Sequence, residues 1–504
     1  MDSAQGLDTN PGTSSRPLKT LTRAAQIALS NYRSGQTTRV VIHPGMYRES
    51  ILMDNKIPNR TGAISFEAGS PGEVIVSGAD VWAGWQPDPS MAGQYIHSWP
   101  YHWGPCTLPP NWPPLADIVR RREMIFVDGT ALTQTLSRDN LPEGSFFIDE
   151  GAGLTVMRPP AGTDISAATI EVSTRPRLFD SHGIAHLTIR GLTFVGANSC
   201  ISVGAVEIWA GSDEIIEDST VRWNNWDGIK LFSSANSTLR GVVSSHNGSS
   251  GLIAHELTNM TFEDVEMSYN NWRGAQGKFF YFENGGAKFM RVHNSTFKHF
   301  RAVGNETMGL WFDTDNANIL IDASYLCRNQ INGLMLEANQ GPIAVTNSKI
   351  CNNGREGILA YATQNVTLTG NLIAANAGAQ IFVDERKPFR SDHDWETSSN
   401  YTISSSHWTI MGNTIVGFDN RQGLIARFPP PAQSPTLFLE TLHSDSNTWF
   451  HSVNNSSVFT LDPGGPGHAT NKTDLGGWRS VTGQDRNSKF AQPSFDPMAA
   501  CAAP

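Results

Sequence analysis

Short apolar phrases, each opened by a glycine, recur through the middle of the chain. GIKLFSS, GLIAHEL, GAQGKFF, GLWFDTD, GLMLEAN and GILAYAT begin at Gly228, Gly251, Gly274, Gly309, Gly333 and Gly357. Their intervals are 23, 23, 35, 24 and 24 residues, and an insertion near 279–288 accounts for the long one. Looser copies begin at Ala379 and Gly423. A repeat of this length is typical of a solenoid, in which each copy adds one rung to a coil.

Asparagine-rich turns precede several of these glycines, and shorter apolar strands lie between the phrases. The turns read WNNWDG, YNNWRG, CRNQING and CNNGREG. Asparagine tolerates left-handed backbone geometry, and its amide can pair with the copy one rung away. Strands at this spacing, with no helices between them, predict an all-β fold: a right-handed parallel β-helix with about 23–24 residues per rung. A β-propeller would need blades of about 40 residues.

The pattern divides the chain into four parts. Residues 1–79 predict an N-terminal cap, with a helix at the end of segment 8–28, and the first rungs. Residues 80–130 break the period and predict an inserted loop or small β subdomain. Residues 131–463 carry the β-helix, with insertions near 279–288 and 386–407, and residues 464–504 predict an irregular tail.

Alternation within a strand separates a core face from an outer face. In GLWFDTD, the apolar Leu310 and Phe312 point into the coil, so Trp311, Asp313 and Asp315 point outward. In GLMLEAN the same alternation sends outward Met335, Glu337 and Asn339. Equivalent positions on successive rungs then form an outer column of Phe232, His255, Lys278, Asp313, Glu337 and Tyr361, with Asp384 near it and Arg427 further along.

Two carboxylates in this column point to acid–base chemistry. Neighbouring strands place Asp313 and Glu337 roughly 5 Å apart, the spacing of the nucleophile and the acid/base in retaining glycosidases. Like charges at this distance raise the pKa of one partner, and the residues alone leave open which one is the acid. Asp315 is a reserve catalytic candidate at a larger separation, which suits an inverting mechanism.

Neighbours of the acids are candidate substrate contacts. Trp311 offers a platform for the apolar face of a sugar. Lys278, His255, Tyr361 and Asp384 have side chains that bind hydroxyl groups. The competing interpretation is a solvated polar surface, or a group of stacked acids that binds Ca²⁺.

Composition limits the classes of function. The net charge of the 504 residues is −10, from 37 basic and 47 acidic residues, which disfavours binding to nucleic acid. No apolar run is long enough to span a membrane. The sequence has no zinc-type metal motif and no nucleotide or serine-hydrolase motif, so we expect no metal and no organic cofactor. The oligomeric state is left open.

Five cysteines cannot all pair within one chain. Cys327 and Cys351 are 24 residues apart and fall on neighbouring rungs. Their spacing is compatible with a disulfide and equally with a ladder of buried free thiols. The first residues lack the pattern of a signal peptide, and we expect a secreted or periplasmic protein whose signal peptide is absent from this chain.

Several segments resemble those of known proteins. They are DTNPGT…PLKTLTRAAQIA, VVIHPGMYRESI, SGADVWAGW, GLWFDTDNANI…NGLMLEANQGPI and GGWRSVTGQDRNS. Together they resemble secreted right-handed β-helix carbohydrate-active proteins of the pectate-lyase-like superfamily. They are most similar to the β-helix glycoside hydrolases, which include α-L-fucosidase and xylan-active enzymes. This resemblance implies activity on carbohydrate and leaves the sugar undefined.

The sequence therefore predicts a glycoside hydrolase that cleaves a plant or microbial polysaccharide, or its oligosaccharides, with Asp313 and Glu337. One alternative is a polysaccharide lyase, in which Lys278 is the base and Ca²⁺ neutralises a uronate. Another is a non-catalytic β-helix that binds carbohydrate.

Overall fold

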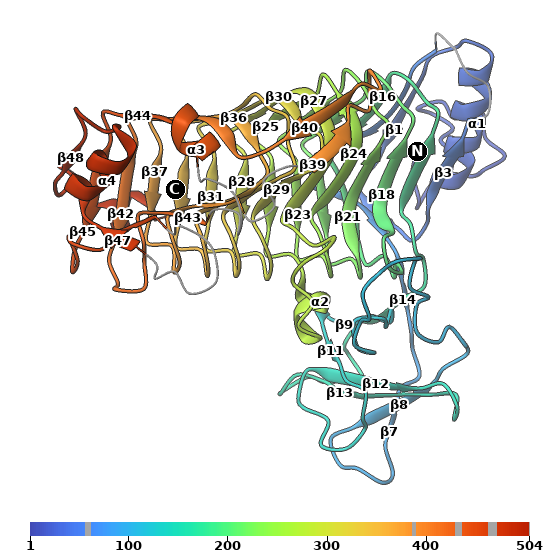
Figure 1. The fold of residues 1–504 in the computed structure, drawn as a ribbon. Coiled ribbons are helices and arrows are strands. Elements are labelled where there is room, and N and C mark those ends of the chain that lie inside the picture. The colour runs from blue at the N-terminus through green and yellow to red at the C-terminus, as the bar shows by residue number, and fades with distance from the viewer. Residues whose placement is uncertain (56–61, 386–389, 429–435, 462–470, 503–504) are drawn as a thin grey trace.

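The chain winds into a parallel β-helix with three walls, from which a small subdomain projects near the N-terminal end (Figure 1). The computed structural model describes residues 1–55, 62–385, 390–428, 436–461 and 471–502. Strands of the same wall pair in parallel from rung to rung, while antiparallel pairs occur mainly in the inserted segments. The right-handed parallel β-helix predicted from the repeat is confirmed. No helix in the described ranges is long and apolar enough to cross a membrane.

The first wall contains five of the six glycine-opened phrases, all except GAQGKFF. Its strands are β3 (Ile51–Asp54), β15 (Phe179–His182), β18 (Gly204–Trp209), β21 (Asp227–Phe232), β24 (Leu252–Thr258), β27 (Ala287–Lys298), β29 (Leu310–Asp313), β32 (Leu334–Glu337), β35 (Ile358–Tyr361), β38 (Ile381–Asp384), β43 (Ile425–Phe428) and β46 (Phe459–Leu461).

The second wall joins the first within one 24-stranded sheet, because β27 is long enough to belong to both. Besides β27 it contains β1 (Thr38–Ile42), β4 (Ile64–Ala68), β16 (Leu187–Arg190), β19 (Ile215–Glu217), β22 (Thr238–Arg240), β25 (Thr261–Glu263), β30 (Ala317–Asp322), β33 (Ile343–Thr346), β36 (Gln364–Thr369), β41 (Ser406–Met411) and β44 (His443–Asp445).

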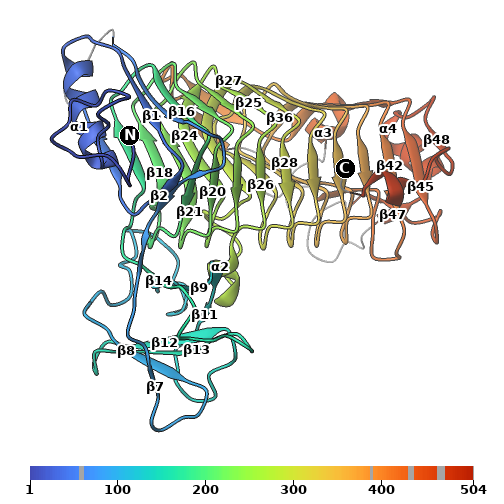
Figure 2. The same ribbon diagram turned by 180° about the vertical axis from the view of Figure 1, so that it is seen from behind.

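The third wall is a separate 13-stranded sheet, seen face-on from behind (Figure 2). It contains β2 (Gly45–Tyr47), β5 (Val74–Ser77), β17 (Leu192–Val195), β20 (Thr220–Arg222), β23 (Val243–Ser245), β26 (Glu266–Ser268), β28 (Arg301–Val303), β31 (Tyr325–Cys327), β34 (Lys349–Cys351), β37 (Leu372–Ala374), β42 (Thr414–Gly417), β45 (Thr448–His451) and β48 (Lys489–Phe490).

Inward side chains of the three walls form one continuous hydrophobic core. Leu310 and Phe312 are fully buried in it, as are their register partners Leu334 and Leu336 on the next rung. A single rung cannot bury its apolar face alone, so the core exists only because rungs stack.

A ladder of buried asparagines runs along one corner of the coil. Each amide nitrogen donates to the side-chain oxygen one rung on, through Asn224, Asn247, Asn270, Asn305, Asn329, Asn353 and Asn376 at 2.8–3.0 Å. The same side chains also bond to backbone groups, for example Asn329 Nδ2 to the Ala302 carbonyl at 3.0 Å. The expected pairing of asparagines from rung to rung is confirmed.

Helices close the two ends of the coil. α1 (Leu21–Arg33) lies over the first rungs, as predicted, and its Ncap Thr20 accepts a hydrogen bond from the Arg23 amide. The C-terminal segment was expected to be irregular, but its described part forms β47 (Asn471–Thr473), α4 (Leu475–Thr482) and α5 (Pro497–Ala500). The buried Trp478 of α4 packs on the last rungs and covers an end that would otherwise be open.

The cysteines pair differently from either expectation. Cys351 is bonded to Cys501, which fastens the C-terminal helix α5 to the third wall, and Cys106 is bonded to Cys200. Cys327 remains a buried free thiol, and burial raises its pKa to about 12. Stacking puts Cys327 beside Cys351, but Cys351 has a partner from the chain end that spacing alone did not reveal.

The inserted β subdomain is larger than predicted. It extends from β6 (Ala79–Val81) to β14 (Ile170–Ser173), because β14 pairs antiparallel with β6 and thereby returns the chain to the coil. Residues 131–173 therefore belong to the subdomain and not to the β-helix. Its other strands are β7 (Gln86–Pro87), β8 (Tyr95–Ser98), β9 (Ile125–Val127), β10 (Thr130–Ala131), β11 (Thr133–Gln134), β12 (Ser145–Asp149) and β13 (Leu154–Arg158).

The subdomain is fixed to the coil by a disulfide and a buried cation. The bond between Cys106 and Cys200 links it to the loop before β18. Arg273 of helix α2 (Trp272–Gln276) is buried between the two parts and donates to Gln134 and to the Glu123 carbonyl of the subdomain, and to Asn225 of the coil. Burial lowers the pKa of Arg273 to about 10.

The asparagine ladder should contribute strongly to stability. Asn353 accepts from the Asn329 side chain at 3.0 Å and donates to Asn376 at 2.8 Å. We expect Asn353→Ala to lower the free energy of unfolding by about 3 kcal/mol, because it leaves several buried polar groups unpaired. Chemical denaturation measures the loss. The exposed Asn365 is the control, and a loss in Asn353→Ala no larger than in Asn365→Ala would contradict this role.

Candidate active site

Asp313 and Glu337 lie side by side on the outer face of the first wall. β29 and β32 are parallel, and the two acids are register partners. Both are half-buried, whereas Leu310 and Phe312 beside Asp313 are fully buried inside the coil. Because parallel strands lie about 4.8 Å apart, the two carboxylates are separated by about one strand spacing. The predicted placement of this pair is confirmed, and its chemical role stays a prediction.

A lysine that the sequence argument missed is bonded to the first acid. Lys288 Nζ lies 2.9 Å from Asp313 Oδ2 and 3.5 Å from the centre of the Trp311 ring. It also donates to the Phe282 carbonyl at 2.5 Å. Lys288 sits on β27, where it is the register partner of Trp311, and only 4% of it is exposed. This lysine is therefore a fixed positive charge against Asp313.

Lys278 was assigned to the column wrongly. The phrase GAQGKFF forms helix α2 and a turn instead of a strand, and Lys278 is exposed with a φ of 57°. The strand begins after Gly286, which is 35 residues past Gly251 and 23 before Gly309. Met290 occupies the position given to Lys278, between His255 and Asp313. The signal that was available is the second phrase GAKFMRV, which keeps the period with Gly309.

Trp311 is outside the coil but is not an open platform. Only 5% of it is exposed, because Lys288 covers its ring and Met308, Ile331 and Met335 pack around it. The alternation rule gave the side of the wall correctly, but it could not show that the insertion before β27 covers this part of it. Trp311 therefore acts on Lys288 and not as an exposed contact.

His255 belongs to an aromatic stack on the same wall. Its ring stacks on Phe232 at 4.7 Å, and the stack continues through Trp209 to His182. Burial lowers the pKa of His255, so the ring is neutral near pH 7. Met290 separates it from Asp313 along the column. Its predicted role as a direct contact therefore requires a ligand that spans more than one rung.

Tyr361 and Asp384 continue the column beyond Glu337. Tyr361 is the register partner of Glu337, and Asp384 is the partner of Tyr361. Tyr361 is half-buried, whereas Asp384 is only 3% exposed. Arg427 lies one position out of this column, opposite the inward Val383, and forms a buried ion pair with Glu385. Of these three, Tyr361 is placed to reach a ligand held at Glu337.

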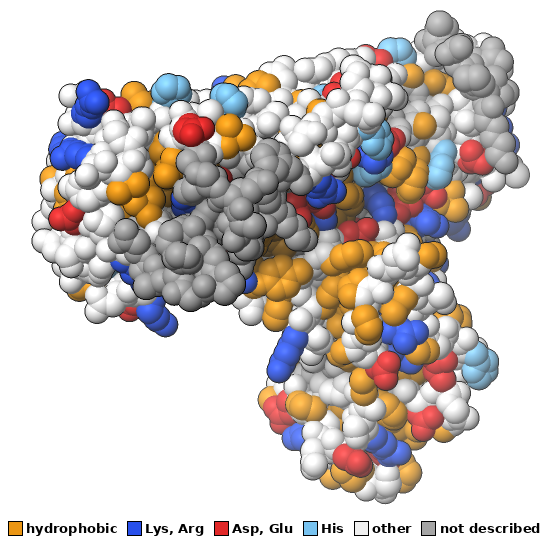
Figure 3. All heavy atoms as spheres, in the orientation of Figure 1, with side chains coloured by type: hydrophobic (Ala, Val, Ile, Leu, Met, Phe, Trp, Pro, Cys, Tyr) orange, Lys and Arg blue, Asp and Glu red, His pale blue; other side chains and the backbone are white. Residues whose placement is uncertain are grey.

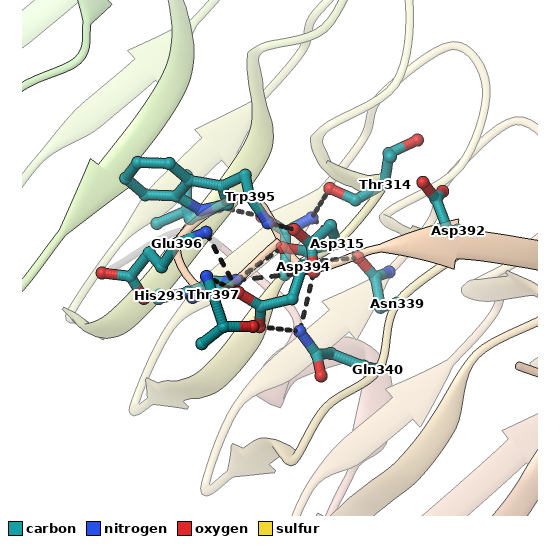
Figure 4. Close-up of polar contacts among 12 residues, drawn as sticks. His293, Thr314, Asp315, Asn339, Gln340, Asp392, Asp394, Trp395, Glu396 and Thr397 are labelled. Atoms are coloured by element: carbon teal, nitrogen blue, oxygen red, sulfur yellow. Dashed lines mark hydrogen bonds and ion pairs between the residues drawn. The ribbon is translucent and has the colours of Figure 1, made fainter. Parts of the chain in front are cut away.

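Asp315 is not available as the reserve acid. It lies fully buried beneath a hairpin formed by β39 (Arg390–His393) and β40 (Asn400–Ile403). Its carboxylate accepts hydrogen bonds from the Trp395 amide at 2.8 Å and from Gln340 Nε2 at 2.7 Å (Figure 4). It also accepts one from the Tyr401 hydroxyl at 3.1 Å. Strand β29 ends at Asp313, and Thr314 and Asp315 have left-handed φ values of 58° and 56°, so the alternation no longer holds at Asp315. Asp315 fastens the hairpin.

His293 completes this attachment as a charged group. Its Nδ1 lies 2.5 Å from Glu396 Oε2, and its Nε2 lies 3.5 Å from Asp315 Oδ1 (Figure 4). Burial lowers the pKa of His293, but the hydrogen bonds and charges of Asp315 and Glu396 outweigh it and raise the pKa to about 9. The imidazolium at neutral pH therefore holds the hairpin next to the strand that carries Asp313.

One group of residues in the described ranges has the proximity needed for a metal ion. Donor atoms of His293, Asp315 and Asp394 all lie within 4.8 Å of one another. His293 Nδ1 already lies against Glu396 Oε2, and the Asp315 carboxylate already accepts hydrogen bonds from three donors. The group is therefore better described as an ion pair that secures the hairpin.

A second buried charge cluster flanks the acids on the N-terminal side. Lys230 is two strands before Lys288 in the same column and donates to Ser202 at 2.8 Å. Ser202 in turn donates to Glu283 at 3.0 Å. Burial first, and then the charge of Glu283, raise the pKa of Asp227 well above the usual range. Figure 3 shows acidic and basic side chains gathered where the coil meets the subdomain.

Comparison with known proteins confirms the fold. A family model for the right-handed β-helix region matches residues 204–373. No curated protein sequence matches the chain. The complex structure of XylC with xylose has a TM-score of 0.69 at 13% identity, over 99% of this chain and 87% of that chain.

Two further solved structures are similar. The A-module of the Azotobacter vinelandii mannuronan C-5 epimerase AlgE6 has a TM-score of 0.53 at 16% identity, over 94% of this chain and 95% of that chain. A structure described as a glycoside hydrolase has a TM-score of 0.52 at 10% identity, over 88% and 96%. At these identities the likeness establishes the shared β-helix fold.

The His293 ion pairs should make stability depend on pH. The folded pKa of about 9 lies above the ordinary 6.5, so the stabilisation is complete below pH 6.5 and is lost as the pH rises through 9. We expect His293→Gln to cost about 3 kcal/mol more at pH 6 than at pH 10. Thermal unfolding at both pH values measures this difference, with the exposed His443→Gln as control. An equal cost at the two pH values would contradict the charged state.

Proposed function

We propose that the protein is a glycoside hydrolase that acts on a polysaccharide or its oligosaccharides through Asp313 and Glu337. The observation that carries this proposal is the register pairing of the two acids on neighbouring strands of the outer wall. Their spacing of roughly 5 Å is that of a retaining enzyme, because an inverting enzyme leaves room for a water between the carboxylates.

The surroundings of the acids suggest a role for each. Asp313 is held in an ion pair by Lys288, and a carboxylate is the form that attacks the anomeric carbon. Glu337 then gives its proton to the leaving oxygen, so the glycosidic bond breaks as the Asp313–sugar ester forms. In the second half, Glu337 takes a proton from water, which displaces Asp313 and releases a sugar of retained configuration.

Lys288 is proposed as the residue that positions Asp313. The Phe282 carbonyl and the Trp311 ring fix its ammonium group from two sides. A preorganised charge of this kind costs no reorganisation during the reaction. Tyr361, beside Glu337, is the next candidate for a substrate contact.

The comparisons support a neutral sugar as the first substrate to try. The structure with the highest TM-score of those described above holds xylose. Lys288 is already paired with Asp313, which makes it less suited to hold the carboxylate of a uronate polymer. Aryl-glycosides and oligosaccharides of neutral sugars, xylose included, therefore head the panel. The two disulfides support a secreted or periplasmic location.

Removal of either acid should abolish turnover, and the products of azide rescue should distinguish the role of one acid from that of the other. We expect Asp313→Ala and Glu337→Ala to lower kcat on oligosaccharides by about 10³-fold or more. Azide should rescue both variants on an activated aryl-glycoside, because a small anion fits the space of a missing carboxylate. NMR of the glycosyl azide should show retained configuration for Glu337→Ala and inverted configuration for Asp313→Ala.

Other outcomes would redirect the proposal. Inverted configuration of the wild-type product would contradict the retaining mechanism. Glycan binding by wild type and by both variants, without turnover on a broad panel, would favour a non-catalytic carbohydrate-binding β-helix. Exchanged azide products would reverse the two roles.

A polysaccharide lyase is the second candidate, and one observation keeps it open. Lys288 lies beside Asp313, and both β-elimination and epimerisation, the activity in the name of the AlgE6 neighbour, begin with removal of a proton next to a uronate carboxylate. Against it, the Lys288 nitrogen already contacts Asp313 and donates to the Phe282 carbonyl, whereas a base needs a free lone pair. Release of an unsaturated uronate product that EDTA abolishes would favour the lyase.

Variants of Lys288 and Lys278 test which lysine acts beside the acid pair: Lys288, as the structure indicates, or Lys278, as the sequence predicted. We expect Lys288→Met to lower kcat/KM for the glycoside by about 100-fold or more, because it removes the charge that holds Asp313. Lys278→Met is the matched control and should leave kcat/KM unchanged, since Lys278 is exposed and away from the column. Steady-state kinetics of both variants decide this, and an effect confined to Lys278→Met would overturn the assignment.

A further inference from the structure

The inserted subdomain contains a cavity of its own. It has a volume of about 430 Å³ and is lined on one side by Trp82, Trp85 and Tyr95, and on the other by Asp164 and Ser166. All of its lining residues belong to the subdomain, in the segments 82–95 and 164–170. Strands β7 and β8 of this subdomain are labelled in Figure 1. It is therefore separate from the wall that carries Asp313.

The aromatic side of this cavity is rigid. Gly84, with a φ of 88°, turns the chain between Trp82 and Trp85, and Trp85 Nε1 donates back to the Trp82 carbonyl at 3.0 Å. The His97 ring packs against both, at 4.8 Å from Trp82 and 5.2 Å from Trp85. Trp82 and Tyr95 are only half-buried. The Trp82 ring, which these contacts hold, and the Tyr95 ring of β8 thus line the cavity without being enclosed in the core.

Three polar groups that line the cavity have hydrogen-bonding capacity to spare. Across the described residues, Trp82 Nε1, the Tyr95 hydroxyl and Asp164 Oδ2 form no hydrogen bond. Asp164 Oδ1 accepts from the Ser166 amide at 3.0 Å and from its hydroxyl at 2.7 Å, and these bonds lower the pKa of Asp164. The cavity therefore offers two donors and one anionic acceptor.

The ligand chemistry follows from this combination. A sugar ring has an apolar face that packs on an aromatic ring and an edge of hydroxyl groups that both donate and accept. No Lys, Arg or His lines the cavity, and the charge of Asp164 disfavours an acidic sugar. The volume lies in the range of small-ligand sites and exceeds what a single ammonium group would fill.

We propose that this cavity is a second saccharide-binding site, which takes one or two rings of a neutral glycan and acts independently of the chemistry at Asp313 and Glu337. Trp82 and Tyr95 contact the apolar face, and Asp164 accepts a hydrogen bond from a hydroxyl group. A site on the projecting subdomain would hold one part of a glycan chain while another part of the same glycan lies on the first wall. The subdomain is kept in place for this by the disulfide between Cys106 and Cys200 and by Arg273.

Affinity electrophoresis of the full chain in gels with soluble neutral polysaccharides tests the proposal. The Glu337→Gln background prevents hydrolysis during the run. We expect Trp82→Ala to weaken binding about tenfold, and Tyr95→Phe and Asp164→Asn to weaken it less. Tyr269→Ala, which removes an exposed ring from the coil, is the matched control and should bind as the parent does. In the otherwise wild-type chain, Trp82→Ala should leave kcat/KM on an aryl-glycoside unchanged.

The outcomes separate this site from the wall. Equal retardation of the parent and of all three cavity variants would overturn the proposal, whether or not the protein hydrolyses glycosides at Asp313 and Glu337. Failure of the parent to bind any neutral glycan of the panel would overturn it as well. Binding of choline in place of glycan, lost in Trp82→Ala, would show that the cavity recognises a cation. Because Tyr95→Phe and Asp164→Asn are nearly isosteric, loss of binding in them cannot be attributed to a collapsed fold.

Discussion

In-register stacking of rungs is the constraint on which this structure depends. The rungs before and after it provide partners for the backbone and the asparagine amides of each rung, as the unbroken series from Asn224 to Asn376 shows. Because hydrogen bonding fixes the register, every side chain of a strand is placed relative to its counterparts on the neighbouring strands. The outer wall therefore inherits its geometry from the buried ladder and core.

The acid pair is a direct product of this constraint. Asp313 and Glu337 occupy one position on two successive strands, so their separation is a property of the sheet and not of flexible loops. Two carboxylates this close repel each other unless a cation or a proton intervenes. Lys288, one strand back and over the Trp311 ring, supplies a cation to Asp313. This ion pair favours the charged form of Asp313 beside a second carboxylate.

The insertions give the regular coil its specific features. The segment around α2 and Phe282 orients Lys288. Asp315 and His293 hold the hairpin of β39 and β40 against the coil. Arg273 holds the subdomain. Each attachment uses a buried charge or a set of hydrogen bonds to fixed backbone. Such contacts are stable because their partners lie on strands that the coil already holds in place.

The sequence by itself determined the fold and the position of the acid pair, because a period near 23 and alternation within strands are local patterns that stacking preserves. It did not determine which residues share the neighbourhood of the pair.

Lys288 was missed because two glycine phrases compete within one long interval, and the shift of register moved the assignment to Lys278. Trp311 was placed on the correct side of the wall, whereas Asp315 lies beyond the end of its strand, and other segments of the chain bury both residues. The partner of Cys351 and the end of the subdomain were also set by contacts between distant segments. Only the tertiary structure decided these points, because long-range contacts leave no periodic trace in the sequence.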